Sequence, residues 1–195
     1  MINDALFYNL FESIGGEKIM PPAAPLYHSN FIMELATTIN IYLRRNKNGY
    51  VFTDDVDVHL PDGNLFKPDL VVVKKENASI LKQGKAIYGT PDMVVEVLSR
   101  STKKRDVTVK KDAYEANGVK EYWIVDPKYK SIDVYLLHDG KFVFDNDYTL
   151  YEDDDPEWQH MSDEEKAAVK SEITLSIFPD LTVKLSEIFV WADDF

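Results

Sequence analysis

The feature of this sequence that most constrains its fold is a nearly continuous apolar run at residues 92–98, Asp-Met-Val-Val-Glu-Val-Leu. A strand with so little alternation of polar and apolar side chains is typical of the centre of a sheet that is buried on both faces. The pattern then predicts a helix at Arg105–Asn117, ended by Gly118, and a second apolar strand at Glu121–Val125. Strand, helix and strand in this order predict an α/β fold with a mixed sheet flanked by helices.

The remaining segments fit the same class of fold. A helix is expected at Asp4–Ile14, within an N-terminal segment 1–16 that Gly15-Gly16 would end, and a longer amphipathic helix at Tyr27–Arg45. Further strands are expected at Lys18–Met20, Tyr50–Phe52, Val56–Leu60, Asp69–Val73, Ile132–Leu137 and Lys141–Phe144, the last two forming a hairpin around Asp139-Gly140. The length predicts one domain, 1–195, in which 152–171 is an acidic insertion or mobile loop, helical in part at Ser162–Val169.

Composition excludes several classes of protein. There are no cysteines, so disulfides, thiolate zinc sites and a cysteine nucleophile are excluded. No basic n-region opens the chain, and no apolar run approaches the roughly 18 residues that cross a bilayer. We therefore expect a cytoplasmic protein without a membrane partner.

The charge is distributed unevenly. The chain carries a net −12, whereas residues 100–111 carry +5, which leaves −17 for the rest. A uniformly acidic surface would repel nucleic acid, but a local basic strip can hold a phosphate backbone. The alternative interpretation of this strip is a solvated helix start.

Glu96 lies in the middle of the predicted central strand, where water cannot solvate its charge. An unpaired buried carboxylate costs on the order of several kcal/mol, so Glu96 must be protonated, paired with a cation or bound to a metal. A salt bridge to Lys110 or Arg105 is the structural interpretation, and a metal ligand is the functional one.

Asp69 is a second carboxylate, at the start of a predicted strand. It follows Pro68, which cannot donate a ladder hydrogen bond and so marks the strand's first residues. If this strand neighbours that of Glu96, both carboxylates can converge on one cation, and their hard oxygens suit Mg²⁺ or Mn²⁺ rather than zinc. Asp92 is a poor substitute, because four residues of extended strand put it roughly 13 Å from Glu96.

Lys110 lies on the helix that follows the Glu96 strand, on one face with Asp106 and Tyr114. A helix that crosses back over the sheet would bring its first turns near the end of that strand. There a lysine could stabilise a phosphate or hold an attacking water. Lys111 is the neighbouring alternative, and a solvated surface lysine is the structural one.

Several segments together resemble a known family, the Uma family of restriction-endonuclease-like proteins in the PD-(D/E)XK nuclease superfamily, common in bacteria. The resemblance covers nearly the whole chain. The residues that carry it are Pro22–His28, Phe66–Val73, Pro91–Ser99, Ser101-Thr102, Asp106, Lys110, Tyr114, Gly118–Pro127 and Ile177–Leu181.

The resemblance implies a restriction-endonuclease-like PD-(D/E)XK core, an α/β (α+β) fold, that hydrolyses phosphodiester bonds of nucleic acid, with DNA the expected substrate. It implies Asp69, Glu96 and Lys110 as catalytic residues, with Asp69, Glu96 and the Val97 carbonyl holding Mg²⁺ or Mn²⁺. The usual motif has lysine two residues after the glutamate, where this chain has Leu98, and Lys110 matches the helix lysine that replaces it in this family. Many enzymes of the superfamily are dimers, so a homodimer is among the partners that the resemblance allows.

Other residues carry open alternatives. His28 matches a frequent family histidine that is structural as readily as catalytic, and Glu34 is a candidate additional acid. Tyr114, Tyr122 and Trp123 could stack on bases, although Trp123 in an apolar strand favours the core. Two rival functions remain: a catalytically silent binding module on the same fold, and a metal-dependent hydrolase of small phosphoesters.

Overall fold

The central element of the fold is a six-stranded sheet in the order β12-β11-β10-β9-β6-β3. The computed structural model describes the chain except for residues 1–10, 21–25, 54–55, 83–84, 99–105 and 191–195. The strands span Gly49–Thr53 (β3), Leu70–Lys74 (β6), Met93–Val97 (β9), Glu121–Asp126 (β10), Ser131–His138 (β11) and Lys141–Thr149 (β12). Only β9 and β10 of this sheet run parallel, so the sheet is mixed, as the sequence predicts.

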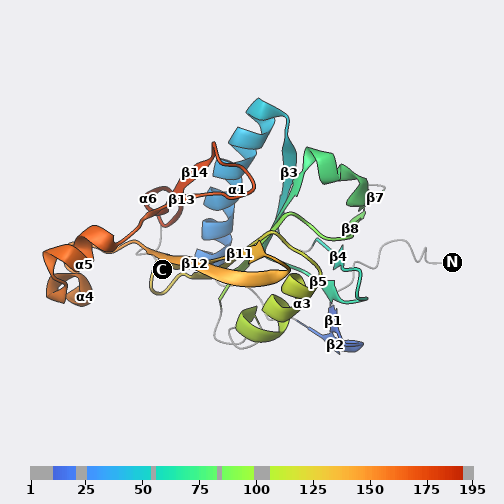
Figure 1. Cartoon of the computed structure of the whole chain (residues 1–195), viewed down its shortest axis with the longest axis horizontal. Coiled ribbons are helices and arrows are strands. Elements are labelled where there is room, and N and C mark those ends of the chain that lie inside the picture. The colour runs from blue at the N-terminus through green and yellow to red at the C-terminus, as the bar shows by residue number, and fades with distance from the viewer. Residues whose placement is uncertain (1–10, 21–25, 54–55, 83–84, 99–105, 191–195) are drawn as a thin grey trace.

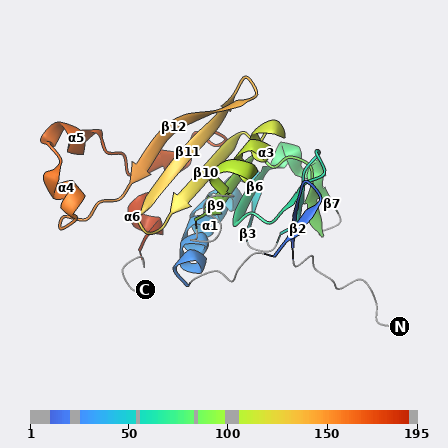
Figure 2. The same cartoon turned by 90° about the horizontal axis from the view of Figure 1, so that it is seen from below.

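Both faces of the sheet are covered, which explains the continuous apolar run in β9. Leu70, Val95 and Trp123 pack on one face against α1 (Leu26–Asn46), together with α6 (Leu185–Ile188). Val94 and Tyr122 pack on the other face against α3 (Lys111–Ala116) and a smaller sheet. Figure 2 shows α1 and α3 on opposite sides of β9 and β10.

Helix α1 confirms the predicted long amphipathic helix. Its buried stripe includes Phe31, Leu35, Ile39 and Leu43, at the spacing of three to four residues that one helical face requires. The helix ends before β3, to which it packs closely (Figure 1). Its first turn carries His28, which is buried and therefore placed beside the sheet.

The smaller sheet has the order β2-β1-β5-β4-β8-β7, lies beside α3 (Figure 1) and shares a hydrophobic cluster with β6. Its strands span Glu12–Ile14 (β1), Glu17–Ile19 (β2), Val58–His59 (β4), Leu65–Phe66 (β5), Leu81–Lys82 (β7) and Ala86–Tyr88 (β8). A 3₁₀ helix, η2 (Lys75–Ile80), connects β6 to β7. The strand expected at residues 56–60 is thus reduced to the two residues of β4.

The helix predicted at Asp4–Ile14 is wrong at its C-terminal end, because residues 12–14 form β1; residues 1–10 lie outside the described chain. Gly15 and Gly16 have φ values of 56° and 86° and join β1 to β2 as a two-residue hairpin turn. The glycine pair that suggested a helix stop therefore ends a strand. Glu12 is therefore a strand residue and not a helix residue.

The helix predicted at Arg105–Asn117 begins irregularly. Residues Asp106–Lys110 form a π-helical turn, η3, and the regular α-helix α3 starts only at Lys111. Single π-turns are often found at functional sites, because they change the direction of one side chain relative to the helix that follows. Lys110 is the last residue of this turn.

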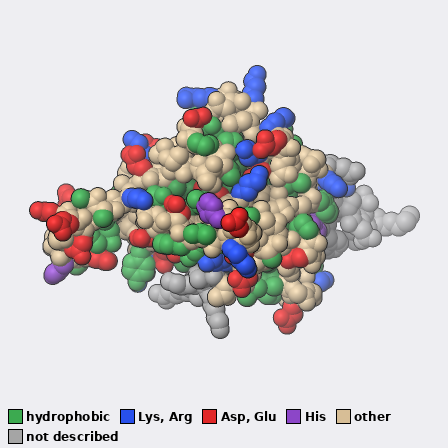
Figure 3. Space-filling view, in the orientation of Figure 1, with side chains coloured by type: hydrophobic (Ala, Val, Ile, Leu, Met, Phe, Trp, Pro, Cys, Tyr) green, Lys and Arg blue, Asp and Glu red, His purple; other side chains and the backbone are tan. Residues whose placement is uncertain are grey.

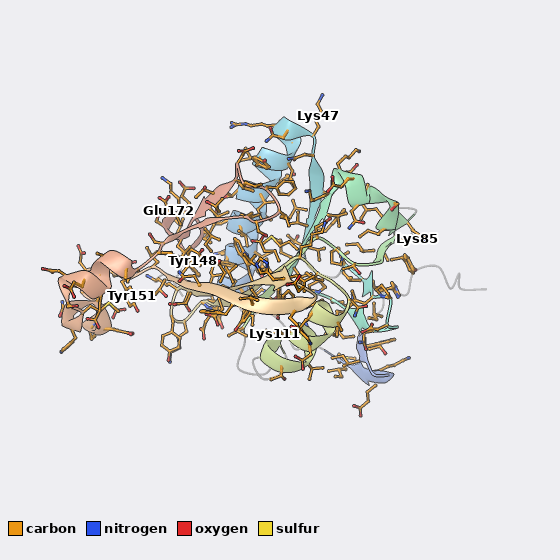
Figure 4. All side chains as sticks on the ribbon, in the orientation of Figure 1. Lys47, Lys85, Lys111, Tyr148, Tyr151 and Glu172 are labelled. Carbon is orange, nitrogen blue, oxygen red and sulfur yellow. The ribbon has the colours of Figure 1, made fainter. Side chains whose placement is uncertain are left out.

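The acidic segment 152–171 contains two short helices, α4 (Pro156–His160) and α5 (Asp163–Ala168), that project from the body of the protein (Figure 1). Ser162 and Glu165 form a capping box at α5, which confirms the predicted helical part. Tyr151 lies beside these helices (Figure 4), and the ring of Trp158 stacks on it with centroids 5.5 Å apart. Acidic side chains gather on this projection in Figure 3.

The chain closes with a two-stranded sheet of β13 (Glu172–Thr174) and β14 (Thr182–Lys184), followed by α6. The segment between these strands is tied to the main sheet by Glu121. Its buried carboxylate accepts hydrogen bonds from the main-chain N–H groups of Ser176 and Ile177 and from Trp123 Nε1. Burial nevertheless raises the pKa of Glu121 above its ordinary value.

The hairpin of β11 and β12 forms as predicted around Asp139-Gly140, and it carries a pH-sensitive contact. Tyr148 donates to Asp145 Oδ2 at 3.0 Å, and burial, followed by this bond, raises the pKa of Tyr148 to about 12. Between pH 10 and 12 the native state keeps a proton that the unfolded chain loses, so stability falls as the pH rises. We expect urea unfolding at pH 9 and 11 to show a larger loss of stability in the wild type than in Tyr148→Phe. An equal loss in both proteins would contradict this assignment.

Among the helices of the described chain, none has the length and apolar character that a membrane span requires.

Candidate active site

Glu96 is the centre of a buried polar cluster. It lies in β9 and is 2 % exposed, on the face of the sheet that packs against α3. Its Oε1 accepts a hydrogen bond from the Tyr114 hydroxyl at 2.8 Å, and its Oε2 lies 2.9 Å from Lys110 Nζ. The sequence predicts that Glu96 needs a cationic partner. In the structure Lys110 is such a partner, as the salt-bridge interpretation expects.

Tyr114 supports Glu96 from α3. Burial, and next the negative charge of Glu96, raises the pKa of Tyr114 well above its ordinary value. The hydroxyl therefore stays protonated and donates to Glu96 across the physiological range. Tyr114 is fully buried, as are Tyr122 and Trp123, so these three rings are core residues and present no face for stacking on a base.

Asp69 immediately precedes β6, which pairs with β9 in an antiparallel register that matches Leu70 with Val95. Extending this register by one residue places Asp69 opposite Glu96, and side chains so related have Cβ atoms about 5 Å apart. Asp69 Oδ2 accepts a hydrogen bond from the Val97 N–H at 2.6 Å. The predicted neighbourhood of the two strands is thus observed.

His28 reaches Asp69 from the first turn of α1, with Nε2 3.1 Å from Oδ1. The Asp69 side chain is 20 % exposed, in contrast to Glu96. Asp69 is therefore the carboxylate nearer to solvent, and its orientation is fixed from both sides by His28 and by the main chain of Val97.

Lys110 lies between two carboxylates. Its Nζ is 2.9 Å from Glu96 Oε2 and 2.8 Å from Glu12 Oε1, and the side chain is only 4 % exposed. Lys111, the alternative lysine (labelled in Figure 4), instead places its Nζ 3.7 Å from the centroid of the Tyr135 ring. Of the two lysines, the structure therefore brings Lys110 to Glu96, as predicted.

Glu12 is the residue of this cluster that sequence reasoning missed. It is 1 % exposed in β1 and also accepts a hydrogen bond from the Lys67 N–H at 3.2 Å. Sequence reasoning placed Glu12 on the predicted N-terminal helix, where a glutamate would normally be solvated. The signal that could have revealed it is the short sequence Glu-Ser-Ile-Gly-Gly-Glu, which also fits a strand and a tight hairpin.

The remaining candidates are Glu34, Asp92 and the basic strip. Glu34 lies on α1 about 9 Å along the helix axis from His28 at the usual rise, and its role stays a prediction. Asp92 lies at the opposite end of β9, where it binds Lys120 Nζ at 2.7 Å, consistent with its exclusion as a metal ligand. Most of the basic strip, residues 100–105, lies outside the described chain.

The described side chains of the cluster bring carboxylates and an ammonium close together. Glu12 and Glu96 both contact Lys110, and Asp69 contacts His28. Nearby, Lys67 Nζ lies 3.0 Å from Asp57 Oδ1. Carboxylate oxygens such as those of Asp69 and Glu96 are the ligands that Mg²⁺ prefers.

The residues present fit a magnesium-type site better than a zinc site. Within the described residues, no group of three or more histidine and acidic side chains gathers around one point. Zinc sites need three or four such protein ligands, whereas Mg²⁺ keeps several waters and uses one or two carboxylates together with substrate phosphates. The hydrogen bonds to Asp69 and Glu96 are of the kind that orient metal-ligating carboxylates.

Comparison with known proteins places the chain in a class. The sequence profile of the Uma2 family, described as "Putative restriction endonuclease", matches residues 9–170, and the chain belongs to this family. A crystal structure from Anabaena variabilis ATCC 29413, described as a putative nuclease belonging to DUF820, has a similar fold, with a TM-score of 0.67. The two are 18 % identical over 93 % of this chain and 90 % of that one. No curated protein sequence matches the chain.

The fold is therefore that of the restriction-endonuclease-like nucleases, as the sequence predicts.

Proposed function

We propose that this protein is a divalent-metal-dependent endonuclease that hydrolyses phosphodiester bonds, with DNA as its substrate. The observation that carries this proposal is the facing position of Asp69 and Glu96 at the paired strands β6 and β9, with the Lys110 ammonium 2.9 Å from Glu96. Membership of the Uma2 family agrees with a nuclease.

The site residues have distinct roles in this proposal. Asp69, Glu96 and the main-chain carbonyl of Val97 would hold the cation, and His28, which contacts Asp69 Oδ1, would orient that carboxylate. A bound Mg²⁺ supplies Lewis acidity toward the phosphate and a more acidic water molecule. Lys110 keeps its ammonium beside Glu96, where it stabilises the negative charge that develops on the phosphate oxygens.

The test is a cleavage assay of the wild-type protein on duplex DNA, single-stranded DNA, RNA and a small phosphodiester, with Mg²⁺, with Mn²⁺ and with EDTA. We expect internal cleavage of DNA that needs the metal and stops with EDTA. Hydrolysis of the small ester alone would favour the small-phosphoester hydrolase. Binding of DNA by folded protein without any hydrolysis would favour the silent module, and either outcome would contradict the proposal.

A further inference from the structure

Glu12 is a buried charge whose position only the folded chain reveals. It comes from β1, which pairs with β2 on one side and, through Ser13 and Leu65, with β5 on the other. The small sheet therefore delivers a carboxylate to the face of the main sheet that carries Glu96. An unneeded glutamate at 1 % exposure would be costly, so its retention there calls for a physical reason.

The contact with Lys110 gives that reason. Without Glu12, Lys110 would keep its contact with Glu96, and its ammonium would neutralise more of the charge of Glu96. With Glu12 at 2.8 Å on the other side, the ammonium is shared between two carboxylates at nearly equal distances. Glu96 then retains negative charge for a further cation while Lys110 stays fixed beside it.

We propose that Glu12 is a positioning residue. It shares the charge of the Lys110 ammonium, so that Lys110 neutralises Glu96 only in part and Glu96 can still bind a divalent metal. This inference rests on the proposed function for its metal, but the placement of Lys110 by Glu12 does not depend on catalysis. Glu12 acts through Lys110 and is not itself assigned as a ligand.

The experiment compares the wild type with Glu12→Gln, which keeps the shape of the side chain and removes its charge. The control is Glu17→Gln, the same change at an exposed residue of the neighbouring strand β2. Two quantities are measured in each folded protein: Mn²⁺ affinity by calorimetry, and the acylation rate of Lys110 by an amine-reactive reagent, located by mass spectrometry.

We expect Glu12→Gln to weaken Mn²⁺ binding by about 10- to 100-fold, the range for groups that orient a metal ligand. We also expect faster acylation of Lys110, since one of its two carboxylate anchors is lost, and no change in Glu17→Gln. Unchanged affinity together with unchanged acylation would overturn the proposal. If the wild type binds no Mn²⁺, the proposed function fails, but the acylation rates still decide whether Glu12 positions Lys110.

Discussion

Replacing Lys110 with methionine is expected to lower the free energy of unfolding by about 3–5 kcal/mol, the usual effect of removing one partner from a buried ion pair. Methionine keeps most of the side-chain volume and removes the ammonium, which lies 5.9 Å from the centroid of the Phe66 ring, so the main loss is the charge. Glu12 and Glu96 would then face each other without the ammonium between them. Urea unfolding monitored by circular dichroism in EDTA measures the effect.

Two further variants test the origin of that effect. Lys111→Met makes the same change one residue along the chain, where the lysine contacts the Tyr135 ring, and should cost no more than about 1 kcal/mol. The double variant Glu12→Gln, Lys110→Met removes one of the two repelling charges and should recover part of the lost stability. A Lys110→Met protein as stable as Lys111→Met would contradict the buried ion triplet.

Glu96→Gln and Asp69→Asn are each expected to reduce metal-dependent cleavage by at least about 100-fold. Even changes to groups that only hydrogen-bond to a metal ligand lower metal affinity or activity by about 10- to 100-fold. The fold should survive Glu96→Gln, since Lys110 keeps Glu12 as an ionic partner and the amide oxygen can still accept from Tyr114. Initial rates of plasmid nicking at saturating Mg²⁺ measure the loss.

The chain supplies a matched control for each change. Asp180 follows a proline, as Asp69 does, but is exposed, and Glu172 lies exposed on β13. Asp180→Asn and Glu172→Gln should cleave at the wild-type rate. Cleavage by Glu96→Gln or Asp69→Asn at a rate within a few-fold of these controls would exclude the carboxylate pair as the catalytic site.

The elements that could be predicted from the sequence are those governed by local pattern. The apolar stripe of α1 predicts a helix, and the uninterrupted apolar run of β9 predicts a buried strand. Burial on one helical face or on both faces of a strand gives each element a recognisable spacing of apolar residues. The Asp139-Gly140 turn was equally clear, since both residues accept positive φ, 49° and 78° here. The small sheet was largely missed, because two- and three-residue strands leave no period to detect.

The same difference between local pattern and tertiary pairing explains which residues of the candidate site could be predicted. Asp69, Glu96 and Lys110 could be selected because a charge inside an apolar strand, a Pro-Asp at a strand start and a helix lysine are visible in the chain. Glu12 could not, since its burial depends on the pairing of β1 with β5, residues far apart in sequence. The hydrogen bond from Tyr114 to Glu96 depends likewise on how α3 packs over β9.

The measurement that most directly tests the central claim is calorimetric titration of Mn²⁺ into the wild type, Asp69→Asn, Glu96→Gln and the Asp180→Asn control. Each titration includes a non-hydrolysable DNA oligonucleotide, so that a site completed by substrate phosphate is also detected. We predict binding of Mn²⁺ to the wild type and the control, and its loss in the two site variants. Absence of binding in the folded wild type, or binding unaffected by both site variants, would contradict a metal site built from Asp69 and Glu96.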